Sequence, residues 1–185
     1  MHKNFNETYH FIDKFKEADL IKLTNKISLI YRNYEKKIDV DLIKKIKSFC
    51  KKTNRKFYLA NETKLAFSLA LDGVYIPSFN NSLKHLVYPK RVNFRIIGSA
   101  HNLKEILTKK LQQVEIIFLS PIFKTTKNKK FLGLYRFLYL KNFTNQKVIA
   151  LGGVNNFNFK KVKLTKSYGI AAISSIKSLY DARSD

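Results

Sequence analysis

Residues that could bind a phosphate group follow one of the apolar segments in the middle of the sequence. The segment 124–127, Lys-Thr-Thr-Lys, comes shortly after the apolar run 114–119, which Ser120 and Pro121 end. Hydroxyl and ammonium groups at the end of a buried strand suit an anion, because they donate hydrogen bonds and supply positive charge. A solvated lysine-rich loop remains an alternative interpretation of this segment taken alone.

A second set of candidates lies near the end of the chain. Gly152-Gly153 follows one apolar run, and Ser174-Ser175 follows the next. Glycine lets backbone N–H groups approach an anion closely, and serine hydroxyls at a helix start can donate to it. In barrels of alternating strands and helices, phosphate commonly binds after the seventh and eighth strands. A glycine pair alone indicates a turn, but the two features together predict a phosphate site.

Apolar, strand-like segments alternate with amphipathic segments along the whole chain. The predicted strands cover residues 9–12, 27–31, 56–60, 72–76, 94–98, 114–119, 147–151 and 169–173. Continuous apolar strands separated by helices are typical of a parallel sheet covered on both faces. Eight strands and eight connections predict an α/β fold, a compact (β/α)8 TIM barrel. We expect one barrel domain over residues 1–185.

Local signals place several helix starts. Asp39 is expected to cap one helix, and Asn102 with Glu105 forms the pattern of a capping box. Asn61 stands where a cap is expected for the helix after the third predicted strand. The remaining helical segments are expected near residues 15–25, 82–87, 132–139 and 155–162.

The composition bounds the partners that we expect. The formal net charge is +23, but only six of the 36 basic residues are arginines, and the lysines are spread evenly. This pattern favours a compositional bias over a nucleic-acid interface, so we expect neither a nucleic-acid nor a membrane partner. The single cysteine, Cys50, falls on an apolar helical stripe, so we expect it to pack in the core. A single cysteine cannot form an intramolecular disulfide, which fits a cytoplasmic protein.

Five short motifs lie at the ends of predicted strands. They are Asp72-Gly73-Val74, Ser99-Ala100-His101, Ser120-Pro121-Ile122-Phe123, Gly152-Gly153-Val154 and Ile173-Ser174-Ser175-Ile176. In this order and spacing they resemble the thiamine phosphate synthase family, over about residues 30–176. The resemblance implies a barrel that joins a hydroxymethylpyrimidine diphosphate to a thiazole phosphate, giving thiamine phosphate and diphosphate. Its expected partners are therefore phosphorylated pyrimidine and thiazole small molecules.

The resemblance also implies a role for each matching residue. The residues matched to diphosphate binding and catalysis are Arg32, Ser99 and, if one residue is missing beside it, Lys127. The residues matched to substrate binding are the loop residue Thr125 and the thiazole-phosphate cradle of Gly152, Gly153, Ile173 and Ser174. His101 belongs to the same strings and is expected to hold its loop, with a general acid–base role as the alternative.

The sequence departs from the family pattern at the expected magnesium site. Asn61 and Asn80 stand where the family has aspartates that bind Mg²⁺, and Ile30 and Tyr34 replace a glutamine and a lysine beside Arg32. Magnesium prefers anionic oxygen ligands, so exchanging two carboxylates for amides removes both negative charges. We therefore expect weak Mg²⁺ binding at these positions, where cap or loop roles are the alternative.

Two functions follow from these observations. The first is a diverged thiamine phosphate synthase, and the second is a barrel that has lost catalysis and binds a phosphorylated thiamine-related ligand. Magnesium-dependent product formation would separate them. Nucleic-acid binding is a third function, for which the sequence offers no recognition motif. The related thiazole tautomerases use a histidine where this chain has Pro121, so that activity is not expected.

Overall fold

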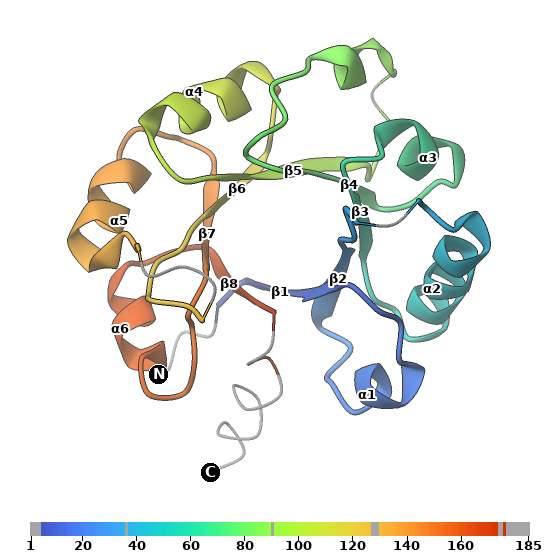
Figure 1. The fold of residues 1–185 in the computed structure, drawn as a ribbon, viewed down its shortest axis with the longest axis horizontal. Helices are drawn as coiled ribbons and strands as arrows, with labels where there is room; N and C mark the ends of the chain where they lie inside the picture. Colours follow the sequence, from blue (N-terminus) through green and yellow to red (C-terminus); the bar gives the residue numbers. More distant parts are fainter. Residues whose placement is uncertain (1–4, 36, 90, 127–129, 174–175, 177–185) are drawn as a thin grey trace.

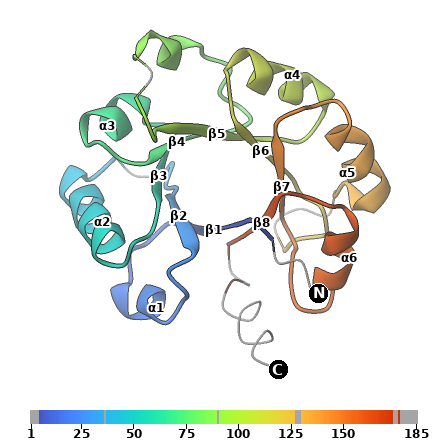
Figure 2. The same cartoon turned by 180° about the vertical axis from the view of Figure 1, so that it is seen from behind.

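A computed structural model describes residues 5–35, 37–89, 91–126, 130–173 and 176. Its eight strands form one closed barrel in chain order, in which every neighbouring pair is parallel and β1 pairs with β8. Figure 1 and Figure 2 show the ring of strands from its two ends, with the helices arranged around the outside. The predicted α/β TIM-barrel fold is confirmed.

The strands agree closely with the predicted segments. They are β1 Glu7–Ile12, β2 Ile27–Tyr31, β3 Phe57–Ala60, β4 Gly73–Ile76, β5 Arg95–Ala100, β6 Ile116–Leu119, β7 Lys147–Leu151 and β8 Gly169–Ala172. β5 extends two residues beyond its predicted end, so Ser99 lies within the strand. All eight strands run in the same direction around the ring, so their carboxyl ends share one rim of the barrel.

Several helices are shorter than the patterns indicated, among them those expected near residues 15–25 and 155–162. They are α1 Glu17–Ile21, α2 Val40–Lys52, α3 Thr63–Ser68, the 3₁₀ helix η1 Lys84–Val87, α4 Leu103–Leu111, α5 Gly133–Lys141 and α6 Phe159–Leu164. Two predicted caps are confirmed: Asp39 accepts bonds from two N–H groups of α2, and Asn102 accepts one from Glu105. The predicted Asn61 cap is wrong, because α3 begins after Glu62 and has no side-chain cap.

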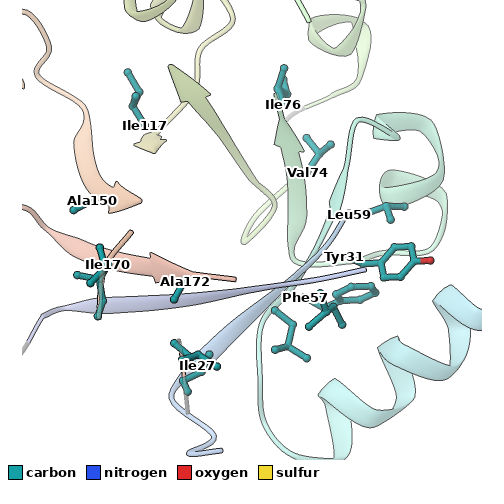
Figure 3. Close-up of a cluster of buried hydrophobic side chains, with 14 of the residues drawn as sticks. Ile27, Tyr31, Phe57, Leu59, Val74, Ile76, Ile117, Ala150, Ile170 and Ala172 are labelled. Atoms are coloured by element: carbon teal, nitrogen blue, oxygen red, sulfur yellow. The ribbon is translucent and has the colours of Figure 1, made fainter. Parts of the chain in front are cut away.

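The core consists of two shells separated by the strands. Inside the barrel, aromatic rings meet edge to face, with centroids 4.9 Å apart for Tyr9 and Phe118 and 5.1 Å apart for Phe11 and Tyr75. Outside it, aliphatic side chains fill the space between strands and helices, as Figure 3 shows for Ile27, Val74 and their neighbours. This alternation arises because successive strand residues point to opposite faces.

Residues expected in the core are buried there. Ile116 and Ile149, which would be exposed in a different sheet arrangement, lie inside the barrel. Cys50 is buried on α2, and burial raises the pKa of its thiol to about 12. A protonated, buried thiol packs as a small apolar group, as predicted. In the part of the chain that the structure describes, no helix has the length and apolar character needed to cross a bilayer.

Candidate active site

Arg32 lies at the rim formed by the carboxyl ends of the strands, one residue after β2. Its backbone N–H donates to the Ile12 carbonyl at 2.8 Å, which ties it to the end of β1. Its guanidinium carbon lies 4.9 Å from the centroid of the Phe11 ring. No described carboxylate forms an ion pair with Arg32. A half-buried guanidinium without a carboxylate partner is suited to a bound anion.

Ser99 points into the barrel near the same rim and is buried. Its Oγ accepts a hydrogen bond from the Ser78 N–H at 3.0 Å. Burial raises the pKa of the Tyr75 hydroxyl, and a side-chain hydrogen bond with Ser99 acts in the opposite direction. Ser99 therefore connects β5 to the segment after β4, and this connection fixes the position of its hydroxyl.

The glycine pair after β7 has the backbone conformation that a phosphate cradle requires. Gly152 and Gly153 have φ angles of 93° and 70°, which favour glycine over any side chain. A Cβ on Gly153 would lie 2.5 Å from the Lys124 carbonyl oxygen, so the loop after β6 packs directly against it. Among the hydrogen bonds within the described residues, neither glycine N–H is a donor. Such N–H groups at a strand end are suited to an anion.

Of the four remaining predicted site residues, the structure describes two, Thr125 and Ile173. Thr125 is half-buried in the loop after β6, close in sequence to the segment that packs on the glycine pair. Ile173 directly follows β8 and is about half exposed, at 51%. Lys127 and Ser174 lie outside the described residues, so their roles stay predictions. The described candidates thus lie at or near the rim formed by the carboxyl ends of the strands, after β2, within β5 and after β6, β7 and β8.

The two asparagines expected at the magnesium positions bind each other. The Nδ2 of Asn80 donates to the Oδ1 of Asn61 at 2.7 Å, and the Oδ1 of Asn80 accepts from the Ser82 N–H at 2.8 Å. Asn61 has a φ of 64°, which places it in the left-handed region and not in a helix cap. Both amide oxygens therefore already accept hydrogen bonds. We call this arrangement the amide bridge.

The amide bridge does not fit a magnesium ion. Mg²⁺ needs anionic oxygens in an octahedral arrangement, and this pair offers two neutral oxygens that both have N–H partners. In the described ranges, no group of three or more His, Cys, Asp or Glu side chains could hold a metal ion. Positions 61 and 80 therefore offer two hydrogen-bonded amides and no carboxylate.

An aromatic pair at the rim was not identified as such from the sequence. Tyr34, which follows Arg32 by two residues, meets Phe79 edge to face with ring centroids 5.4 Å apart. Both rings are exposed, and Phe79 directly precedes Asn80.

His101 has the expected loop-holding role, since its Nδ1 lies 2.6 Å from the Ser120 carbonyl oxygen.

Comparison with known proteins identifies the family of this chain. The model of the family described as thiamine monophosphate synthase matches residues 16–176. The chain belongs to the thiamine monophosphate synthase family. The matched range contains β2 through β8 and with them every candidate residue described above. The family resemblance inferred from the five motifs is confirmed.

Individual members of the thiamine monophosphate synthase family are moderately similar to this chain. The putative thiamine-phosphate synthase 2 of Aquifex aeolicus is 31% identical over 137 residues, 72% of each chain. The thiamine-phosphate synthase of Prochlorococcus marinus is 30% identical over 145 residues, which are 75% of this chain and 40% of that protein. A thiamine phosphate pyrophosphorylase from Pyrococcus furiosus superposes with a TM-score of 0.77 at 19% identity, covering 97% and 94% of the two chains, which supports the fold alone.

The glycine pair allows a direct test of phosphate binding. Replacing Gly153 with alanine should weaken thiazole phosphate binding at least ~10-fold, because the new Cβ would displace the loop after β6 and strain the backbone. The matched control is Gly133→Ala, which has a similar φ of 68° but whose Cβ would approach no atom closer than 3.9 Å. Isothermal titration with thiazole phosphate measures both. Equal weakening in both variants would indicate a general effect of backbone strain.

Proposed function

We propose that this protein joins a hydroxymethylpyrimidine diphosphate to a thiazole phosphate, producing thiamine phosphate and diphosphate. The bond between the pyrimidine methylene carbon and the diphosphate oxygen breaks, and its electron pair leaves with the diphosphate. The lone pair of the thiazole nitrogen then forms the new carbon–nitrogen bond. The reaction requires alignment of two anionic substrates and positive charge on the leaving group.

The observation that carries this proposal is the placement of two anion-binding groups on one rim. Arg32 offers a guanidinium that no described carboxylate pairs with, and Gly152 and Gly153 offer two N–H groups that donate to no described partner. In the proposed assignment, Arg32, Ser99 and Lys127 bind the diphosphate. Gly152, Gly153, Ile173 and Ser174 bind the thiazole phosphate, and Thr125 lies in the loop between the two.

In this assignment the protein holds the leaving group with fixed positive charge. The Arg32 guanidinium can donate two parallel hydrogen bonds to the phosphate oxygens, where negative charge increases as the bond breaks. The Phe11 ring beneath it restricts its orientation before substrate binds. Because the amide bridge does not fit a metal ion, no step of this proposal depends on protein ligands for magnesium.

A second candidate is a binding protein for the same class of ligand. The amide bridge favours this candidate. The Nδ2 of Asn80 donates to the Oδ1 of Asn61 at the two positions where the resembled family has acids. Such a protein would retain affinity for phosphorylated thiazole but would release no diphosphate. The two candidates share a site and differ in whether the carbon–oxygen bond breaks.

One experiment separates these two functions. The full chain is incubated with both phosphorylated substrates, with and without Mg²⁺, and thiamine phosphate and diphosphate are measured. Slow formation of both products in equal amounts is the expected result. If no product forms either with or without Mg²⁺, but thiazole phosphate still binds, the result would support the binding function. Absence of both product and binding would contradict the proposed site altogether.

A further inference from the structure

A fully buried lysine lies behind the rim, on the inner side of α4. Lys109 has 0% of its surface exposed. Its Nζ donates to the carbonyl oxygens of Pro77 at 2.8 Å and Asn80 at 3.1 Å, and to the Oε1 of Gln112 at 2.7 Å. An ammonium group has three N–H donors, so each of them has an acceptor. A buried charge is costly unless it is fully hydrogen-bonded, and here it is.

The surroundings of Lys109 are shaped for this side chain. A Cβ on Gly98 of β5 would lie 3.2 Å from the Lys109 Cδ, so the glycine leaves space for the lysine stem to pass along the strand. Burial lowers the pKa of the Lys109 ammonium to about 8, and the charge on Glu105 acts against that shift. The three acceptors around its Nζ match the three N–H groups of the protonated form.

Gln112 completes the contacts between α4 and the segment after β4. While its Oε1 accepts from Lys109, its Nε2 donates to the carbonyl oxygens of Asn80 at 2.8 Å and Ser82 at 2.9 Å. The Asn80 carbonyl thus accepts from both side chains. Lys109 of α4 and Gln112, which directly follows α4, together hold the backbone at 77, 80 and 82.

The segment held in this way, residues 77–82, contacts three parts of the candidate site. The Ser78 N–H donates to Ser99, and the Phe79 ring packs on Tyr34. The Asn80 side chain forms the amide bridge to Asn61. A cation that fixes the backbone of this segment therefore also fixes its contacts with the segments after β2 and β3 and with β5.

We propose that the Lys109 ammonium is a built-in cation that positions residues 77–82 and the amide bridge, so that this part of the site is organised without a bound metal ion. Lys109 acts through the Asn80 backbone and is a positioning residue, since it does not reach the rim itself. The proposal concerns the geometry of the site and does not require the activity proposed above. It can be tested in the absence of any substrate.

The test measures hydrogen exchange of the Ser82 amide, which donates to the Oδ1 of Asn80, by NMR on the full chain. The Leu29 amide, which donates to the Lys56 carbonyl at 2.8 Å in the barrel, reports global opening. The test variant is Lys109→Met, whose side chain has a similar length and is apolar but lacks the positive charge and the three N–H donors of Nζ. The matched control is Lys110→Met, the exposed neighbour on the same helix.

We expect Lys109→Met to raise the amide exchange rate of Ser82 at least ~10-fold relative to that of Leu29. Lys110→Met should leave the exchange rates of both amides unchanged. Magnesium at about 10 mM should not slow Ser82 exchange in the natural protein, because the amide bridge offers no carboxylate ligand for the ion. Unchanged relative exchange in Lys109→Met, or slower Ser82 exchange on adding magnesium to the natural protein, would overturn the proposal.

A second variant keeps the proposal testable if Lys109→Met does not fold. Gln112→Glu retains an acceptor for Lys109 but removes the two N–H donors to Asn80 and Ser82. It should also speed Ser82 exchange relative to Leu29, by a smaller factor, because the ammonium still holds Pro77 and Asn80. Equal exchange rates in this variant and the natural protein would likewise contradict the proposed role of Lys109 and Gln112 in holding residues 77–82.

Discussion

Replacing Arg32 with alanine is expected to lower thiamine phosphate formation at least ~100-fold. In the proposed assignment the guanidinium binds the leaving diphosphate, and removing one such group from an anion site typically costs about 10²–10³ in rate. The Phe11 ring beneath it would remain in place, so the barrel should stay folded. Steady-state assays of thiamine phosphate with both substrates at saturation measure the effect.

Two further variants control the Arg32 prediction. Arg136→Ala removes an exposed arginine of α5 and should leave the rate unchanged, which excludes a general effect of net charge. Arg32→Lys keeps the charge but loses the paired N–H donors, so an intermediate rate is expected. Full activity in Arg32→Ala would show that the diphosphate binds elsewhere on the rim.

Restoring both acids, Asn61→Asp with Asn80→Asp, is expected to make the protein respond to magnesium. Two carboxylates would face each other where an amide now donates to an amide oxygen at 2.7 Å. Their repulsion costs about 1–4 kcal/mol near 4 Å, depending on the local dielectric, and a divalent cation removes it. The melting temperature of the double variant should therefore rise on adding Mg²⁺, and thiamine phosphate formation should increase.

The single variants are the controls for this prediction. Each retains one amide, which can donate to the new carboxylate, so each should need no cation for stability. Calorimetric titration with Mg²⁺ and melting curves measure all four proteins. Magnesium binding or strong magnesium-dependent turnover by the natural sequence would contradict our interpretation of the two asparagines.

The barrel could be predicted because its signal is repeated. Each strand is a short apolar run covered on both faces, and eight such runs with helical segments between them leave few alternative arrangements. The boundaries were less certain where a helix has only one or two turns, as in α1 and α6. Short helices depend on packing more than on their own sequence, so their ends are set by the tertiary structure.

The candidate site was predicted less completely, for reasons visible in three residues. Asn61 has the residue type of a helix cap, but asparagine also tolerates the left-handed conformation that it adopts here. Its bond to Asn80 joins positions nineteen residues apart, which no local pattern indicates. Lys109 falls three residues after the buried Ile106 on α4, but lysine is so often exposed that its position on this face was not recognised as a signal.

The amide bridge also has a consequence for how such barrels can diverge. Because an asparagine amide can rotate to offer either its oxygen or its NH₂ group, a single exchange at position 61 or 80 leaves a bonded pair in either order. Only the second exchange creates the repulsion that demands a cation. A lineage can therefore pass between an ion-dependent and an ion-independent site through intermediates that keep their fold, and dependence on the metal would be gained or lost in one mutational step.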